Sequence, residues 1–282
     1  MKKYRYLKII IFSLLLFNCA KEADLETSQI DTTPPQLNNL DVWLRKTFVK
    51  PYNIEIQYKW NVNETDIARY LHPPFQSSVK PVAEVLLKAW IEPYYKVGGK
   101  DFIKKIAPRQ FTFVGSFNYN PNSPTITLGV AEAGTKITLF NIDYLDFTDI
   151  NSIKEPIKTV QHEYGHILNQ TRPIDPAYGQ INPANYTAQW FNRTDAQARE
   201  LGYITAYGSS QEGEDFVEMV AIMLTNSKTD FDAIVNGITN SGAKAIIRKK
   251  EQMVVDYYKK EFGIDIYELQ KLTEAATKAL VK

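Results

Sequence analysis

The 282-residue sequence predicts an α+β fold in which a small mixed sheet precedes a mainly helical C-terminal part. Two observations predict this order. Runs rich in β-branched and aromatic residues, bounded by turn residues, are concentrated in the first half of the chain. In the second half, apolar residues recur at the three- and four-residue spacing of helices. A long amphipathic stretch joins the two halves, and we expect it to form the central helix.

Strands and helices are both expected in the first half. The segment 52–60 (Y-N-I-E-I-Q-Y-K-W) alternates polar and apolar residues, which is typical of a half-buried strand. Further strands are expected at 110–117, 125–130 and 135–140, and Gly134 predicts a hairpin between the last two. Helices are expected at 40–48, 79–94 and 101–106. We expect Pro93 and the Gly98-Gly99 pair to break this helical run.

Helical periodicity dominates the rest of the chain. Between residues 153 and 170, six apolar residues form one stripe about 100° wide on a helical wheel. Residues 172–190 contain three prolines and are expected to form a loop. Further helices are expected at 194–201, 214–226, 243–262 and 267–281. We therefore expect one domain over 38–282, with an α/β part to about residue 170 and a helical part over 171–282.

The charge balance excludes some classes of partner. The chain has 33 basic and 32 acidic residues, so its surface is expected to carry little net charge. It has no basic cluster of the kind that binds phosphate backbones, and we expect no nucleic-acid partner. A single cysteine also excludes an intramolecular disulfide. The fold must therefore be stabilised by its hydrophobic core or by a bound metal.

The N-terminus has the pattern of a secretory signal. Four basic residues among the first eight precede the apolar run 9–17, which is too short to span a bilayer. Cys19, the only cysteine, follows this run in an arrangement that resembles a bacterial lipobox. We expect residues 1–18 to be a lipoprotein signal peptide and Cys19 to be the lipidated first residue of the mature protein. The alternative is an ordinary signal peptide with an incidental cysteine.

The segment after Cys19 is polar and has the composition of a flexible tether, which we expect over residues 19–37. Its early acidic cluster resembles the surface-export signals of Bacteroidetes lipoproteins. That resemblance implies an outer-membrane lipoprotein that is anchored in the membrane by its N-terminal lipid and exposed at the cell surface. A periplasm-facing orientation stays open as an alternative.

Residues 162–166 match the pattern H-E-x-x-H of zinc hydrolases. On a helix, His162 and His166 lie one turn apart on the same face, where two ring nitrogens can bind one metal ion. Both lie opposite the apolar stripe, so they are expected to face a cleft. Glu163 has the place of the general base that deprotonates a metal-activated water. The pattern predicts one Zn²⁺ ion and a catalytic role for Glu163.

A catalytic zinc site needs a third protein ligand. The three-histidine extension of the motif is excluded, because its further positions hold Asn169 and Arg172. The one remaining histidine, His72, lies far upstream between leucine and two prolines, where a surface position is the simpler interpretation. A carboxylate on a downstream helix is left as the third ligand.

The best carboxylate candidates open the helix expected at 214–226. Glu214 and Glu218 share the face opposite its apolar stripe, whereas Asp215 lies off that face and is a weaker candidate. An acidic helix start is commonly just solvated and favoured by the helix dipole. This helix, however, repeats the layout of the histidine helix and supplies the missing type of ligand.

The segment 207–218 resembles the zinc-ligand segment of gluzincins of the anthrax lethal factor type, in which a tyrosine precedes the ligand glutamate by seven residues. The resemblance implies a zincin-like metalloprotease fold. It implies that Glu214 is the third zinc ligand and that Tyr207 is the phenol that stabilises the oxyanion. Glu218 would orient a ligand histidine. Tyr203 is a rival for the role of Tyr207.

From about residue 40 onward, the layout is similar to that of zinc metallopeptidase lipoproteins of Bacteroidetes, with a sharp match only at 160–170 and 203–221. The similarity implies a peptidase that acts on a peptide or protein substrate, in association with TonB-dependent import components. Two alternatives stay open. The zinc site could belong to a non-catalytic binding lipoprotein, against which Glu163 argues. The substrate could also be a non-peptide, because specificity depends on cleft walls such as the loop 172–190.

Overall fold

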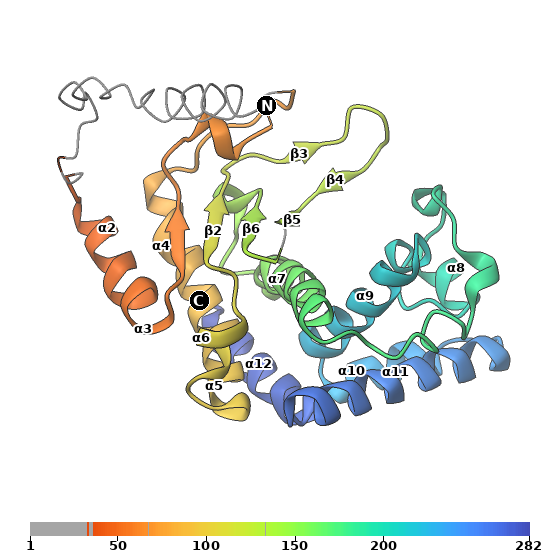
Figure 1. Ribbon diagram of the computed structural model, residues 1–282. Coiled ribbons are helices and arrows are strands. Elements are labelled where there is room, and N and C mark those ends of the chain that lie inside the picture. The colour runs from red at the N-terminus through yellow and green to blue at the C-terminus, as the bar shows by residue number, and fades with distance from the viewer. Residues whose placement is uncertain (1–32, 34–35, 67, 133) are drawn as a thin grey trace, which may run out of the picture. The chain divides into compact units, whose positions relative to one another are not determined.

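In the computed structural model, which describes residues 33, 36–66, 68–132 and 134–282, four strands form a sheet in the order β1-β2-β6-β5 (Figure 1). They are β1 (Glu55–Gln57), β2 (Gln110–Phe113), β5 (Gly129–Glu132) and β6 (Lys136–Leu139). β1, β2 and β6 run parallel, whereas β5 is antiparallel to β6. The sheet is therefore mixed, as expected, and β5 forms one of its edges.

A second, two-stranded sheet pairs β3 (Asn118–Tyr119) with β4 (Ile126–Thr127). The sequence did not predict β3, because two residues carry no periodicity. The single strand expected at 125–130 is divided into β4 and β5, which pair with different partners. The strand expected at 52–60 is reduced to β1. The hairpin expected at Gly134 is confirmed, and this glycine has a φ of 69°.

The helices of the first half form two runs. The first consists of α2 (Asn39–Leu44), the π-turn η1 (Arg45–Val49) and α3 (Lys50–Tyr52). The second consists of α4 (Gln76–Leu86), the π-turn η3 (Leu87–Ile91), α5 (Glu92–Gly98) and the separate α6 (Phe102–Ile106). Short 3₁₀ turns are η2 (Val62–Glu64), η4 (Ile142–Tyr144), η5 (Pro183–Asn185), η6 (Trp190–Asn192) and η7 (Tyr207–Ser209).

The prediction that Pro93 breaks the helical run is wrong. The run continues through Pro93 and ends at Gly99, whose φ of 85° favours glycine. The π-turn just before Pro93 explains the difference. Its hydrogen bonds span five residues, as from the Glu92 N–H to the Leu87 carbonyl, and the wider turn accommodates the proline ring.

The central helix α7 (Ile150–Thr171) has 22 residues, about three turns more than an average helix, and is capped by Asp149, whose side chain accepts a hydrogen bond from the Asn151 N–H at 2.9 Å. Its expected apolar stripe is buried. Tyr164 from this stripe packs edge-on against Trp90, with ring centroids 5.1 Å apart. Trp90 in turn contacts Phe111 of β2, so α7, η3 and the sheet share one core.

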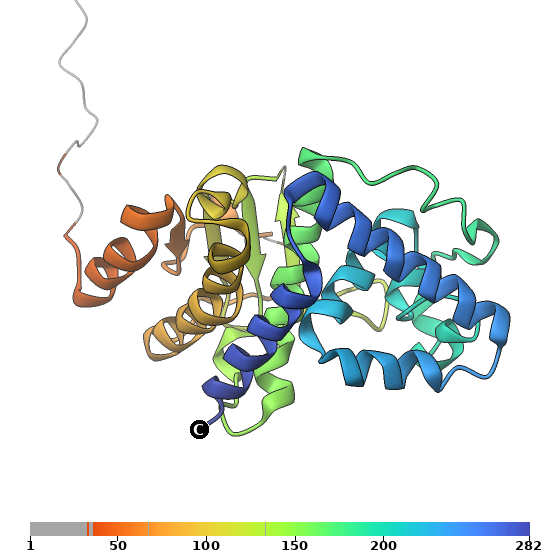
Figure 2. The same ribbon diagram turned by 90° about the horizontal axis from the view of Figure 1, so that it is seen from below.

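The C-terminal part is helical, as expected, with α8 (Asp195–Arg199), α9 (Glu212–Thr225), α10 (Lys228–Asn236), α11 (Ser241–Phe262) and α12 (Ile266–Leu280). The sequence did not predict α10, which buries only Phe231 and Val235. In two perpendicular views, α7 lies between the sheet and helices α8–α11 (Figure 1, Figure 2). The central helix can therefore present side chains to both parts.

The described residues from Asn38 to Lys282 form one compact unit. The predicted signal peptide, Cys19 and nearly all of the predicted tether lie outside the described residues. Across the helices that are described, none combines the length and apolar character needed to cross a membrane.

Candidate metal centre

A glycine allows the two helices of the site to approach closely. A Cβ added at Gly165 of α7 would lie 3.0 Å from Cγ1 and 3.2 Å from Cβ of Val217 on α9. Val217 is fully buried and has little room to move. The absence of a side chain at Gly165 therefore brings the histidine face of α7 against the glutamate face of α9.

Three side chains converge where these faces meet. Glu214 Oε2 lies 3.0 Å from His162 Nε2 and 3.3 Å from His166 Nε2. The three candidate ligand atoms all lie within 4.8 Å of one another. His162 and Glu214 are buried, with 7% and 8% of their surfaces exposed. The helices thus bring together all three residues that the sequence assigned to the metal.

The donor set fits a zinc ion. Glu214 Oε2 is buried and points at the Nε2 atoms of both imidazole rings, but neither ring aligns an N–H with it as in a hydrogen bond. A buried carboxylate oxygen without a hydrogen bond is costly unless a cation is bound to it. Two imidazole nitrogens and one carboxylate oxygen are also a ligand set of catalytic zinc. The other oxygen of Glu214 accepts a hydrogen bond from Gln211 Nε2 at 3.3 Å.

Glu218 fixes the orientation of the first histidine. Its Oε1 lies 2.8 Å from His162 Nδ1, and its Oε2 accepts hydrogen bonds from Thr205 Oγ1 at 2.7 Å and Lys158 Nζ at 3.0 Å. An imidazole that donates from Nδ1 presents the lone pair of Nε2 to the cluster. Burial alone would raise the pKa of Glu218, but its contacts with His162 and Lys158 lower it to about 2.

The charges around His162 also stabilise its protonated form. Burial lowers the pKa of the ring, but the contacts with Glu214 and Glu218 outweigh this effect and raise the pKa to about 9. A bound cation would replace that proton. The surrounding carboxylates therefore stabilise a positive charge at the position between the two histidines and Glu214.

Glu163 lies between α7 and the edge strand β5. Burial raises its pKa, while His162 and His166 oppose the shift and the Ala131 backbone N–H donates a hydrogen bond to it. A Cβ added at Gly129 would lie 2.4 Å from Thr159 Cγ2 and 3.3 Å from Glu163 Oε1. Gly129 thus lets the edge strand pass directly over this carboxylate.

The structure distinguishes between Tyr207 and Tyr203, the two candidates for the oxyanion-stabilising tyrosine. The Tyr207 ring stacks on His162, with centroids 5.6 Å apart and planes inclined by 22°, and burial together with Glu214 raises its pKa. Tyr203 is fully buried and donates its hydroxyl proton to the Asn182 carbonyl. Only Tyr207 therefore lies at the metal cluster, with 37% of its surface exposed.

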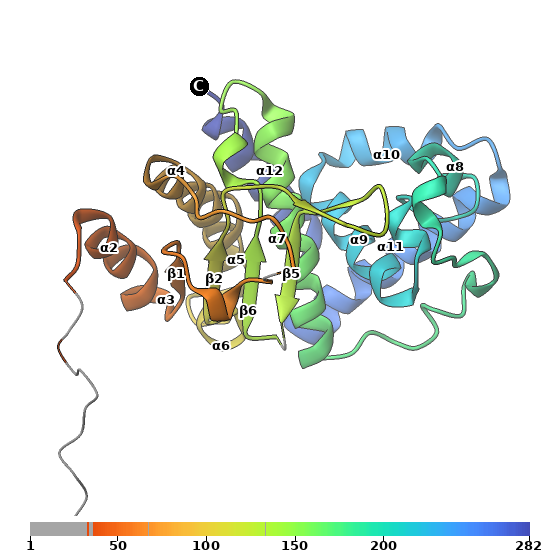
Figure 3. The ribbon, with the colours of Figure 1, turned by 90° about the horizontal axis from the view of Figure 1, so that it is seen from above.

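A cleft of about 540 Å³ opens beside His162 and Glu163. One wall is formed by residues 125–129 of the hairpin and edge strand, and the other by Trp190, Phe191 and Tyr207. The β3–β4 hairpin projects from the sheet toward the helical part on this side (Figure 3). Of the loop 172–190, which was expected to line the cleft, only Ala188 and Trp190 do so.

Three residues of the site were not identified from the sequence: Lys158, Thr205 and Trp190. Lys158 precedes His162 by four residues, and this spacing places both on one helix face. That spacing could have identified it. Thr205 lies in a loop and Trp190 lies in the short 3₁₀ turn η6, where no periodicity indicates the direction of a side chain.

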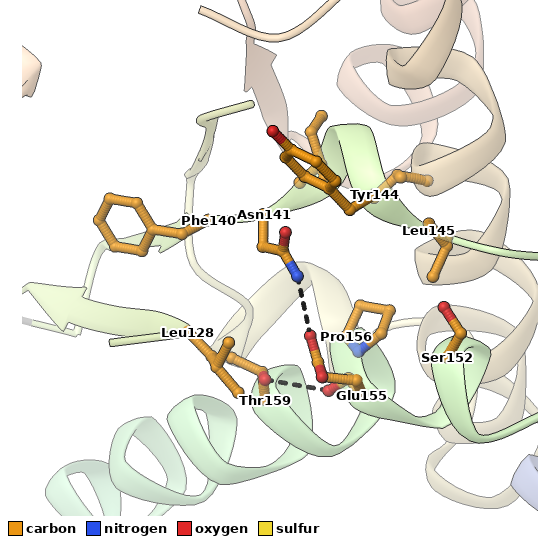
Figure 4. Close-up of a pocket in the computed structure, with 11 residues that line it drawn as sticks. Leu128, Phe140, Asn141, Tyr144, Leu145, Ser152, Glu155, Pro156 and Thr159 are labelled. Atoms are coloured by element: carbon orange, nitrogen blue, oxygen red, sulfur yellow. Dashed lines mark hydrogen bonds between the residues drawn. The ribbon is translucent and has the colours of Figure 1, made fainter. Parts of the chain in front are cut away.

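Two other features lie apart from the cluster. A cavity of about 30 Å³ beside α7 is lined by residues such as Asn141, Tyr144 and Glu155, and an Asn141–Glu155 hydrogen bond crosses it (Figure 4). His72 lies 3.9 Å from Asp143 and contacts the Pro73 carbonyl. Among the described residues, it is not part of the group that could hold a metal.

The solved structure and the protein family that match this chain are both described as a "putative zinc-binding metallo-peptidase". A crystal structure described as "a putative zinc-binding metallo-peptidase from Bacteroides caccae" shares 32% sequence identity with this chain, at a TM-score of 0.71. The match covers 86% of this chain and 92% of that one. No curated protein matches the sequence significantly. Residues 33–267 match a family that is described as "Putative zinc-binding metallo-peptidase", and the chain belongs to this family.

Proposed function

We propose that the protein is a zinc-dependent hydrolase of peptide bonds. One observation carries the proposal: two imidazole nitrogens and one buried carboxylate oxygen converge within 4.8 Å, next to Glu163 and a cleft of about 540 Å³. A structural zinc site has four protein ligands, whereas this cluster offers three. The adjoining cleft would give a substrate access to the remaining position.

His162, His166 and Glu214 would hold one Zn²⁺ ion, and Glu218 would keep His162 in the ligating tautomer. When bound, the ion would supply Lewis-acid activation of a water molecule and of the scissile carbonyl. The fit is supported by the missing hydrogen bond at Glu214 Oε2.

Glu163 would act as the general base and then as the general acid. Its buried carboxylate has a raised pKa, which suits a group that accepts a proton from water and returns it to the leaving amine. Tyr207 would donate its hydroxyl proton in a hydrogen bond to the carbonyl oxygen as that oxygen gains negative charge. Its partial exposure, its place in the wall of the cleft and its contact with His162 support this role. These proposed roles agree with those that the resemblance to gluzincins of the lethal factor type implies.

The cleft suits an extended peptide. β5 is an edge strand, so an extended chain can add to it by backbone hydrogen bonds. Trp190 and Phe191 on the opposite wall offer aromatic surface to an apolar side chain of the substrate. The substrate side chain next to the cleaved bond is therefore expected to be apolar.

We also propose that the protein is anchored to the outer membrane through lipidated Cys19 and faces the cell surface, beside components of TonB-dependent import. The proposal is supported by the basic and apolar N-terminal pattern and by the Bacteroides origin of the similar structure. Expression of the full chain and of Cys19→Ser, each with a tag, tests it. Wild type should partition into detergent and be cut by protease added to intact cells, and Cys19→Ser should do neither.

Digestion of a peptide library tests the enzymatic proposal. Wild type loaded with zinc should cleave peptides, whereas Glu163→Gln should retain zinc and cleave none. Glu155→Gln is the matched control, because Glu155 lines the same cleft but is not part of the metal cluster. Zinc binding without cleavage by wild type would favour the non-catalytic lipoprotein or a non-peptide substrate.

A further inference from the structure

A buried ion pair lies next to the proposed metal site and takes no part in the proposed chemistry. Lys250 of α11 and Asp215 of α9 have no exposed side-chain surface, and Lys250 Nζ lies 2.6 Å from Asp215 Oδ2. The ammonium also donates a hydrogen bond to the Gly202 carbonyl at 3.0 Å and lies 4.3 Å from the centre of the Tyr203 ring. Tyr186 donates its hydroxyl proton to the same Asp215 oxygen at 2.9 Å.

The pair joins three segments that are separate in sequence. Asp215 belongs to the start of α9, Gly202 belongs to the loop after α8, and Tyr186 belongs to the loop before η6. Lys250 contacts Asp215 and Gly202 from α11, which packs against both α8 and α9 (Figure 1), and Tyr186 is joined to the pair through Asp215. The buried ion pair therefore fixes the relative positions of the three segments.

Each of these segments carries residues of the metal centre within a few positions of the ion pair. Asp215 directly follows the candidate ligand Glu214. Thr205, which donates to Glu218, and Tyr207, which stacks on His162, follow Gly202 by three and five residues. Trp190, four residues after Tyr186, packs on Tyr207 with ring centroids 4.8 Å apart.

Stability alone is a poor explanation for the pair. Removing two charges from water costs as much as their attraction returns, and apolar replacements of buried ion pairs are commonly neutral or stabilising. A directional contact such as Lys250 to Gly202 and Asp215 does fix the geometry of the groups that it joins. The physical argument thus favours a role in positioning.

We infer that Lys250 and Asp215 are positioning residues of the metal centre, which hold Glu214, Glu218 and Tyr207 in register with the histidines of α7. The inference rests on the proposed function. Neither residue touches the metal ligand atoms or the cleft, so both act through the segments that they join.

The test compares zinc affinity with thermal stability. Lys250→Met leaves the buried Asp215 carboxylate without its cation and can fail to fold, so the double variant Lys250→Met/Asp215→Asn carries the test. Val254→Ala is the matched control, because Val254 is a fully buried residue of the same helix that makes neither contact. Zinc dissociation constants are measured by chelator competition, and Co²⁺-loaded samples give the ligand-field spectrum.

The double variant should fold, bind zinc about 10- to 100-fold more weakly than wild type and show a changed Co²⁺ spectrum. Val254→Ala should lower the melting temperature and leave both metal readouts unchanged. A folded double variant with wild-type zinc affinity and spectrum would overturn the inference alone. A double variant that fails to fold would also overturn it, because the pair would then be required for the fold itself. A wild type that binds no zinc would overturn the proposed function and the inference together.

Discussion

Glu218 Oε1 lies 2.8 Å from His162 Nδ1, on the side of the ring that faces away from Glu214. One histidine is therefore held between two carboxylates that share a helix face and lie one turn apart on α9. The Nε2 atom of the His162 ring faces the proposed metal position beside Glu214. Glu218 orients the ring through Nδ1 on the opposite side.

Replacement of Glu218 tests the orienting contact. Glu218→Gln should weaken zinc binding by about 10- to 100-fold without removing a ligand, because the amide no longer stabilises the ligating tautomer as strongly. Chelator competition measures the affinity. Glu212→Gln, an exposed position of the same helix, should leave it unchanged. Equal affinity of Glu218→Gln and wild type would contradict the role of Glu218.

Replacement of Gly165 tests the close approach of α7 and α9. Gly165→Ala gains about 1 kcal/mol of helix propensity. It also forces a Cβ to 3.0 Å from Val217 Cγ1, an overpacking that costs about 1–3 kcal/mol. We expect a net loss of about 1 kcal/mol in the free energy of unfolding, together with weaker zinc binding. Urea denaturation measures the loss.

Gly213→Ala is the matched control, because a Cβ at this position of α9 meets no atom within 4 Å. It should be neutral or stabilising. If Gly165→Ala were as stable as Gly213→Ala, the close contact would not limit the helix spacing.

Two tyrosine variants distinguish the oxyanion role from a structural one. Tyr207→Phe should lower kcat by about 10²- to 10³-fold at unchanged zinc content, because one hydrogen bond to the developing oxyanion is lost. Tyr203→Phe should lower the free energy of unfolding by about 1 kcal/mol through loss of the hydrogen bond to Asn182, and kcat should stay near wild type. Steady-state kinetics with a peptide from the library separate the two. The reverse pattern would assign the role to Tyr203.

The pH dependence of stability tests the charges of the metal-free site. The pKa of His162 is raised from 6.5 to about 9, so its contribution is fully present below pH 6.5 and is lost as pH rises through about 9. The pKa of Glu218 is lowered from 4.5 to about 2, so its contribution is present above pH 4.5 and is lost as pH falls through about 2.

The contribution of this pair to the melting temperature should therefore be greatest between pH 4.5 and 6.5. The Glu218→Gln protein should show a flatter profile, measured by thermal denaturation after chelation. Added zinc should restore stability above pH 6.5, because the metal replaces the proton on His162. Identical profiles for the variant and wild type would contradict the coupling.

Much of the fold followed from local patterns. The stripe of α7 and the paired glutamates of α9 repeat at helical spacing, and the structure buries the first and places the second beside the histidines. The proline at position 93 misled the prediction, because a π-turn at its N-terminal side depends on packing and leaves no mark in the periodicity. Likewise, the division of strand 125–130 depends on two different pairing partners.

The residues around the site were harder to predict, because they meet it through long-range contacts. Thr205 comes from a loop and Trp190 from the short turn η6, and the course of both segments is set by tertiary structure. Lys250 did leave a signal that periodicity could have shown. It continues the buried positions Ala243, Ile247 and Val254 of α11, and a lysine on an apolar stripe requires a buried partner.

The central claim is that His162, His166 and Glu214 bind one zinc ion, and zinc content per chain tests it most directly. The protein is stripped with a chelator, reloaded with zinc, desalted and assayed by elemental analysis, together with Glu214→Ala, His166→Ala and the control Glu212→Ala. We predict about one zinc per chain for wild type and the control. The two ligand variants should hold little or none. A wild type without zinc, or ligand variants that retain it in full, would contradict the account.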